Sequence, residues 1–268
     1  MRLIFIGDIF GRSGREAVEK HLPALREEYN TDFVIANVDN AAHGRGITPK
    51  VADELFDLGI DCLTGGNHIW DQREIIPYIQ KNQNLIRAHN MPKQMPGKGM
   101  WESATPDGRK IVVIHLMARL FMEMSDDPFQ EIDRVLKTYK LGQNCNTILV
   151  DCHGEATSEK MALGHYLDGK ISGFFGTHTH IPTADDRILE NGTAYQSDTG
   201  MTGFFESVIG VKKEAAIGRF LKKVPGERFH PAEGEATLCA VFLETSDKTG
   251  HALKLIPIRR GGTLNQAG

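Results

Sequence analysis

The segment Ile171–His180 reads ISGFFGTHTH and joins a short apolar run to two histidines that stand one residue apart. Residues i and i+2 of an extended chain project to the same side, so His178 and His180 can converge on one point. The apolar run predicts a buried strand over residues 171–175, and Gly176 allows a tight turn after it. A single pair of histidines is weak evidence of a ligand site, because many histidines only pack or form hydrogen bonds. Equivalent side chains elsewhere in the chain are therefore decisive.

The same pattern, an apolar run followed by ligand-type side chains, occurs at four further places. Residues 3–6 precede Asp8, residues 33–37 precede Asp39 and Asn40, residues 60–64 precede Asn67 and His68, and residues 147–151 precede His153. In open α/β sheets, ligands bind outside the carboxyl ends of the strands. Five predicted strands therefore deliver carboxylate, amide and imidazole groups to one edge of the sheet.

Amphipathic stretches between these runs predict helices, as in a mostly parallel sheet with βα connections. The expected starts of these helices are a capping box over Ser13–Glu16, Thr48 followed by Pro49, a cap formed by Asp71 and Glu74, and Asp127 followed by Pro128. For Asp71, orientation of His68 is the second interpretation. Gly59 is expected to end the second helix. In the segment HGEATSEK, a capping box at Thr157 or Ser158 and support of His153 by Glu155, Ser158 or Glu159 both remain open.

The pattern changes after His180. A further parallel strand is expected over residues 111–116, but Asn191-Gly192 between residues 187–189 and 193–196 predicts a hairpin. Residues 237–244 and 251–258 predict a second antiparallel pair. Residues 204–235 give no clear pattern. The sequence thus predicts one α/β domain over residues 1–268, with a parallel-dominated core and added antiparallel strands.

The composition excludes several classes of protein. The chain has 268 residues, a formal net charge of -4 and a sequence pI of about 6.3, so we expect no extensive nucleic-acid-binding surface. The four cysteines have no CxxC spacing and indicate buried thiols in a reducing compartment. No apolar run approaches the length of a membrane span, and the N-terminal segment does not match a signal peptide. We expect a cytoplasmic protein with a small-molecule partner.

The side chains at the strand ends predict a metal centre. Taken singly, Asp8 could cap a helix, Asn40 and Asn67 could form turns, and His153 could be a satisfied buried histidine; their coincidence favours metal. Oxygen and imidazole ligands without thiolate suit Mn, Fe or Zn better than Ca or a soft metal. We expect Mn or Fe, with Zn as a further candidate. A single tetrahedral ion needs only three or four ligands, so two ions that share a carboxylate fit the larger set.

Several blocks together resemble a known family. The segments FIGDIFGRSGR, NVDN, NAAHGRGIT, GGNHIWD, EATSEKMALG, GTHTHIPTAD and DTGMTG cover almost the whole chain. They resemble the calcineurin-like metallophosphoesterases, and more narrowly the YmdB-like 2′,3′-cyclic nucleotide phosphodiesterases. The resemblance implies a sandwich of sheets flanked by helices and a binuclear metal centre. It implies that one ion is held by Asp8, Asn40 and His180 and the other by Asn67, His153 and His178, with Asp39 as the bridge.

The same resemblance implies that His68 is the proton donor in the hydrolysis of a 2′,3′-cyclic nucleotide to a 3′-nucleotide. Two residues depart from the pattern. The superfamily has a histidine where this chain has Phe10, which cannot bind a metal, and Asn40 is expected to compensate. The narrower family has glutamate where this chain has the shorter Asp39, which puts metal preference and affinity in question.

The loop AAHGRGIT places His43, Arg45 and Thr48 beside Asn40, where they could contact substrate or remain solvated. Glycines after the first strand imitate a dinucleotide-binding loop, but their spacing is wrong and Asp8 would repel a pyrophosphate. Two other functions remain open. One is a phosphomonoesterase, and the other is a metal-containing regulatory or scaffold protein that acts on RNA metabolism through partners. The sequence also leaves open whether the chain forms a homo-oligomer.

Overall fold

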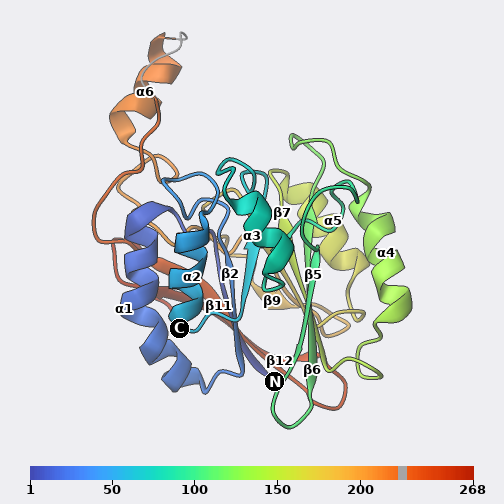
Figure 1. Ribbon diagram of the computed structural model, residues 1–268. Helices are drawn as coiled ribbons and strands as arrows, with labels where there is room; N and C mark the ends of the chain where they lie inside the picture. Colours follow the sequence, from blue (N-terminus) through green and yellow to red (C-terminus); the bar gives the residue numbers. More distant parts are fainter. Residues whose placement is uncertain (223–227) are drawn as a thin grey trace.

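Two six-stranded sheets pack face to face, and helices cover both outer faces (Figure 1). The computed structural model describes residues 1–222 and 228–268. The strand order is β12-β11-β1-β2-β3-β4 in the first sheet and β5-β6-β7-β8-β10-β9 in the second. This architecture confirms the predicted α/β sandwich of parallel-dominated sheets with added antiparallel strands. The single domain over residues 1–268 stays a prediction.

From β1 to β8 the strands and helices alternate, except that β4, β5 and β6 follow one another without a helix. The strands are β1 (Arg2–Ile6), β2 (Phe33–Asn37), β3 (Cys62–Gly65), β4 (Leu85–Arg87), β5 (Met100–Ala104), β6 (Lys110–Met117), β7 (Thr147–His153), β8 (Gly173–Thr177), β9 (Arg187–Ile188), β10 (Ala194–Gln196), β11 (Leu238–Thr245) and β12 (Ala252–Arg260). The helices are α1 (Gly11–Tyr29), α2 (Pro49–Asp57), α3 (Ile75–Lys81), α4 (Pro128–Thr138), α5 (Thr157–Tyr166) and α6 (Lys213–Lys222).

Parallel pairing dominates the centre of each sheet. Strands β1 to β4 pair in parallel, as do β6, β7, β8 and β10. The antiparallel strands lie toward the edges: β11 and β12 extend the first sheet, and β5 and β9 close the second. Both predicted antiparallel pairs are confirmed, including the hairpin at Asn191-Gly192.

Three apolar layers hold the sandwich together. The inner layer lies between the sheets, where the rings of Phe5 and Phe175 stack with centroids 5.5 Å apart. One outer layer joins the first sheet to α1, α2 and α3, and the other joins the second sheet to α4 and α5. Strands covered on both faces are continuous apolar runs rather than alternating ones. This explains why β1 and β2 were recognisable in the sequence.

Some predicted boundaries are wrong. The strands expected over residues 60–64 and 171–175 lie about two residues later, and the short strands β4 and β5 were not predicted. No side-chain cap begins α1, because Ser13 Oγ accepts from the backbone N–H of Gly234 instead of closing a capping box with Glu16. The caps expected before α3 and at Thr157 or Ser158 are likewise absent. Thr48 and Asp127 do cap α2 and α4.

A segment within residues 204–235 projects from the sandwich and carries α6 (Figure 1). Ile217, Phe220 and Leu221 of α6 are exposed. Residues 223–227 of this segment lie outside the described residues. The described helices include none that is long and apolar enough to cross a membrane.

Candidate active site

The ends of β1, β2, β3, β7 and β8 bring the predicted ligands together at the junction of the two sheets. Asp8 Oδ2 accepts a hydrogen bond of 3.0 Å from the backbone N–H of His178. His153 Nε2 lies 3.0 Å from Asn67 Oδ1 and 3.3 Å from Asp39 Oδ2. The rings of His153 and His178 contact each other through Nε2 and Nδ1 at 3.1 Å. Residues distant in the sequence therefore share one site.

Asn40 and His180 form the second part of this cluster. His180 Nε2 lies 3.1 Å from Asn40 Oδ1, and its Nδ1 donates to the carbonyl oxygen of Ile209 at 2.8 Å. The bond to the carbonyl assigns the proton to Nδ1, which leaves Nε2 as the nitrogen with a lone pair. Phe10 packs edge-on against the His180 ring, with centroids 5.4 Å apart. The calcineurin-like superfamily has a histidine at the position of Phe10. In this chain, Phe10 instead packs against the ring of His180.

The donor set fits divalent cations. Among the described residues, Asp8 Oδ1 and Asp39 Oδ2 are buried and make no hydrogen bond of good geometry, although His153 Nε2 lies 3.3 Å from Asp39 Oδ2. Buried carboxylate oxygens without a partner are costly unless a cation or another donor satisfies them. Within the same residues, no three His, Cys, Asp or Glu side chains already surround a common point. The side chains meet in pairs, and the amide oxygens of Asn40 and Asn67 complete the set.

Opposing charges shift the titration of these groups. Burial lowers the pKa of His153, but the carboxylates of Asp39, Asp8 and Asp151 outweigh burial and raise it to about 9. Burial, together with the charges on His153 and His180, lowers the pKa of His178 to about 3. Burial also raises the pKa of Asp8, against the opposing effect of the histidines. A cation at the site would compete with the proton on His153.

A buried network supports His153 from behind. Thr177 Oγ1 lies 3.0 Å from His153 Nδ1 and donates to Asp151 Oδ1 at 2.8 Å. Asp151 Oδ2 accepts from Asn37 Nδ2 at 2.9 Å and from Thr64 Oγ1 at 2.6 Å. Because the Thr177 hydroxyl proton goes to the carboxylate, its oxygen accepts from His153 Nδ1. This network therefore orients the ring so that Nε2 meets Asp39 and Asn67, which is the usual arrangement behind a metal-binding imidazole.

The sequence did not reveal this network. Thr64, Asp151 and Thr177 lie inside predicted strands or beside the histidine pair, where a single sequence gives polar residues no distinguishing pattern. The buried polar side chains within these otherwise apolar runs were the available signal.

His68 follows Asn67 directly and is held from two sides. Its backbone N–H donates to Asp39 Oδ1 at 2.9 Å, and its Nδ1 lies 3.0 Å from Asp71 Oδ2. Arg45 Nε contacts the same carboxylate oxygen at 3.1 Å. Asp71 therefore orients His68 rather than capping α3, and His68 Nε2 remains the ring nitrogen available to a substrate.

The predicted substrate-binding residues His43, Arg45 and Thr48 lie in different environments. Arg45 and His43 are exposed in the loop after Asn40, close enough for Arg45 Nη2 to lie 3.5 Å from His68 Nδ1. The Thr48 hydroxyl caps α2 by accepting from the N–H of Val51. Support of His153 by Glu155 was one of the open alternatives; Glu155 Oε2 lies 3.3 Å from Nε2 of His178, the neighbouring predicted ligand.

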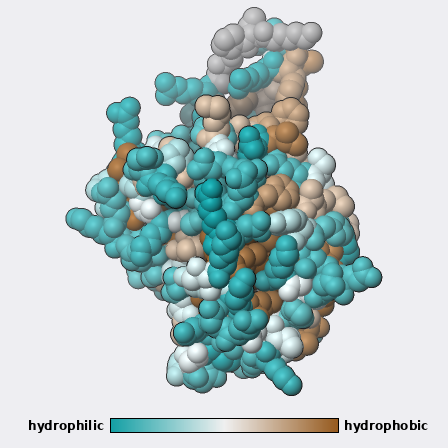
Figure 2. Space-filling view, turned by 90° about the vertical axis from the view of Figure 1, so that its right-hand side faces the viewer, coloured by the Kyte–Doolittle hydropathy of each residue, from teal (hydrophilic) through white to brown (hydrophobic). Residues whose placement is uncertain are grey.

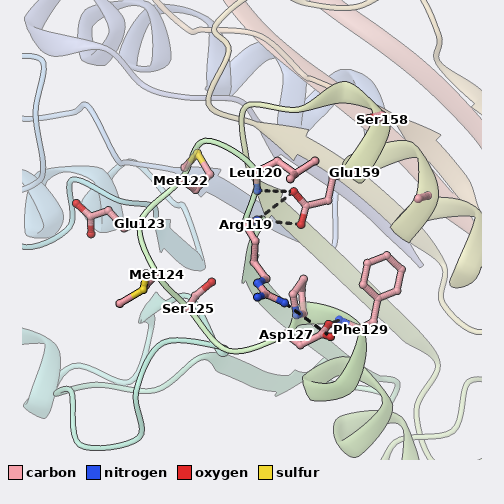
Figure 3. Close-up of a pocket in the computed structure, with 12 residues that line it drawn as sticks. Arg119, Leu120, Met122, Glu123, Met124, Ser125, Asp127, Phe129, Ser158 and Glu159 are labelled. Atoms are coloured by element: carbon pink, nitrogen blue, oxygen red, sulfur yellow. Dashed lines mark hydrogen bonds and ion pairs between the residues drawn. The ribbon is translucent and has the colours of Figure 1, made fainter.

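A pocket of about 670 Å³ adjoins the loop that follows β6 (Figure 3). The loop starts beside the cluster, because the N–H of Ala118 donates to the carbonyl oxygen of His153 at 2.9 Å. The carboxylate of Glu159 accepts from the N–H groups of Arg119 and Leu120 and fixes the first turn of this loop. Apolar and polar side chains line the pocket together, among them Met122, Phe129, Arg119 and Ser158.

The sandwich and the histidine, aspartate and asparagine cluster at its strand ends define the calcineurin-like metallophosphoesterase class. More narrowly, the chain belongs to the YmdB-like protein family, whose profile matches residues 4–258.

A 2′,3′-cyclic-nucleotide 2′-phosphodiesterase of Bacillus subtilis (strain 168) is 43% identical to the chain over 255 residues, which are 95% of each protein. Two solved structures share the fold. A hypothetical protein from Thermus thermophilus matches with a TM-score of 0.90 and 40% identity, covering 98% of this chain and 100% of the other. A novel phosphatase of Mycoplasma pneumoniae matches with a TM-score of 0.91 and 32% identity, covering 97% and 93%.

Proposed function

We propose that this protein is a metal-dependent phosphoric ester hydrolase that converts 2′,3′-cyclic nucleotides to 3′-nucleotides. The observation that carries the proposal is the meeting of five strand ends around the unpartnered oxygens of Asp8 and Asp39. The Bacillus subtilis relative, a 2′,3′-cyclic-nucleotide 2′-phosphodiesterase, supports the choice of substrate.

The cofactor we propose is a pair of divalent ions, Mn or Fe in preference to Zn. Asp8, Asn40 and His180 would hold one ion, Asn67, His153 and His178 would hold the other, and Asp39 would bridge them. When bound, such a pair lowers the pKa of a water molecule and neutralises charge on the phosphate oxygens. The Thr177 hydroxyl oxygen and the Ile209 carbonyl oxygen bind Nδ1 of His153 and of His180, respectively. These bonds keep Nε2 of each ring turned toward the other proposed metal-binding side chains.

His68 is the proposed proton donor to the leaving 2′-oxygen. Asp71 occupies its Nδ1, so a proton on Nε2 is the one that the ring can give to a substrate. Hydrolysis breaks the bond between phosphorus and the 2′-oxygen, the water oxygen joins phosphorus, and the 3′-phosphate remains. Arg45, exposed beside His68, would contact the phosphate.

The pocket after β6 is our candidate for the nucleoside part of the substrate. It begins one residue beyond the backbone bond between Ala118 and His153, and none of its lining residues belongs to the proposed metal-binding set. Met122 and Phe129 offer apolar contact to a base, while Arg119 and Ser158 offer hydrogen-bonding groups (Figure 3).

The four free, buried cysteines support a reducing, cytoplasmic location. Self-association also belongs to the proposal, because Ile217, Phe220 and Leu221 on α6 leave apolar surface uncovered. In Figure 2, brown side chains gather in the upper half of the viewed face and at the base of the projecting segment.

Incubation of the purified protein with Mn²⁺ and 2′,3′-cyclic AMP, followed by chromatographic separation of the products, tests the activity. We expect the 3′-monophosphate, and no product with His68→Ala. Turnover of phosphomonoesters alone would instead identify a phosphomonoesterase. Absence of turnover on all phosphate esters with Mn, Fe and Zn would refute the proposal and leave the scaffold function, which predicts that His68→Ala retains partner binding.

A further inference from the structure

The turn that carries the paired histidines has an unusual backbone. His178 has a φ of 100° and His180 a φ of 70°, both in the left-handed region that glycine normally occupies. Such conformations cost on the order of 1–3 kcal/mol each and persist only where surrounding contacts enforce them. Something outside the turn must therefore hold it in this shape.

Asp198 supplies these contacts through Thr179, the residue between the two histidines. Its Oδ2 accepts from the Thr179 N–H at 3.0 Å and from the Thr179 hydroxyl at 2.7 Å. Its Oδ1 accepts from the Gly200 N–H at 2.9 Å, which fixes the carboxylate in its own loop. One carboxylate thus binds both hydrogen-bond donors of Thr179, its N–H and its hydroxyl.

Lys160 of α5 completes the arrangement. Its Nζ lies 3.0 Å from Asp198 Oδ2 and donates to the carbonyl oxygen of Thr177 at 3.3 Å, the residue before His178. Lys160 and Asp198 side chains are each only 1% exposed. A buried ion pair of this kind seldom adds net stability compared with apolar residues of similar volume. Its contacts to both ends of Thr177–Thr179 suggest a different purpose.

We propose that Asp198 and Lys160 are positioning residues, which force His178 and His180 into the backbone conformation that presents both rings to the metal ions. They belong to the segments DTGMTG and EATSEKMALG, and the proposed function above gives neither Asp198 nor Lys160 a role. This inference rests on the proposed function, because it concerns the same metal centre. The competing explanation is that the pair only stabilises the fold.

Paired measurements on the full chain distinguish these explanations: thermal unfolding without metal, and Mn²⁺ affinity by titration calorimetry. The test variant is Asp198→Asn with Lys160→Met, which removes both charges and leaves none unpaired. Its matched control is Glu131→Gln with Arg134→Met, which removes an ion pair on α4. We expect the test variant to unfold near the wild-type temperature and to bind Mn²⁺ about 10 to 100 times more weakly. We expect the control to bind as the wild type does.

Wild-type affinity in a folded test variant would overturn the inference. Should that variant not fold, Thr179→Val, which loses only the hydroxyl bond to Asp198, is expected to weaken Mn²⁺ binding severalfold, and unchanged affinity would overturn the inference instead. If the wild type bound none of Mn²⁺, Fe²⁺ and Zn²⁺, the proposed function would fail separately. In that case, NMR spectra of ¹⁵N-labelled histidine rings in the metal-free protein test the inference. We expect the ring signals of His178 and His180 to shift in the test variant and not in the control. Unshifted signals in the test variant would refute the positioning role of Asp198 and Lys160.

Discussion

Gly66→Ala should disable the active site without unfolding the protein. A Cβ atom on Gly66 would lie 2.3 Å from His153 Nε2, 2.4 Å from its Cδ2 and 2.5 Å from its Cε1. Ordinary contacts of a Cβ atom begin at 3.4 Å. The ring must therefore move by about 1.1 Å, the difference between 3.4 Å and 2.3 Å. His153 is fully buried and bonded to Thr177, so it cannot swing into solvent.

A misplacement of about 1 Å in a reacting geometry costs roughly 100-fold in rate. We expect a decrease of that order in kcat/KM for 2′,3′-cyclic AMP with Mn²⁺, measured by product chromatography. Overpacking of a buried site costs about 1–3 kcal/mol, so the free energy of unfolding should fall by this amount and the protein should remain folded.

Gly218→Ala is the matched control. It makes the same chemical change in α6, where the added Cβ would meet nothing within 4 Å. Activity should not change, and stability should increase by up to about 1 kcal/mol because alanine favours a helix interior. If Gly66→Ala kept its activity within threefold of the wild type, His153 could not act at the position described here.

Four further outcomes are expected. Thr177→Val should weaken Mn²⁺ affinity about 10 to 100 times in calorimetry, since the Thr177 hydroxyl orients the ring of His153. Thr177→Ser keeps the hydroxyl and should bind Mn²⁺ as the wild type does. Equal affinities in the wild type and both variants would contradict this role of the hydroxyl. Asp71→Asn should lower kcat more than it raises KM by loosening His68; a change in KM alone would point to substrate binding. Asp39→Glu should retain or raise activity, because the family has glutamate there, and loss of the metal, measured by elemental analysis, would refute this. Burial lowers the pKa of His89 in the folded protein, so below pH 6.5 the unfolded chain binds a proton at His89 more readily than the folded protein does. The free energy of unfolding, measured by urea titration, should therefore fall from pH 6.5 to pH 5, and less steeply in His89→Asn. An equally steep fall in both proteins would exclude His89 as the cause.

Much of the fold was predictable because buried parallel strands leave a local signature. The apolar runs before Asp8, Asp39 and His153 are covered on both faces, and each ends in a residue that the sheet edge presents. Local hydrogen bonds also made the start of α2 recognisable, since Thr48 caps the helix from the adjacent position.

The missing parts depend on contacts between residues far apart in the sequence. For Asp71 the helix cap was the preferred prediction and orientation of His68 the second one; the contact of its carboxylate with Arg45 was not predicted. Lys160 and Asp198 are 38 residues apart, and nothing in either segment indicates that they form a buried pair. Short edge strands such as β4 bury too few residues to show a periodic pattern.

The position of β1 has a consequence for biosynthesis. This strand leads into Asp8 and lies between β2, made early, and β11, which begins only at Leu238. A growing polypeptide that already contains His180 thus still leaves one side of its first strand without a hydrogen-bonding neighbour. We expect cations to be captured only after β11 and β12 have been synthesised and have paired on that side of β1.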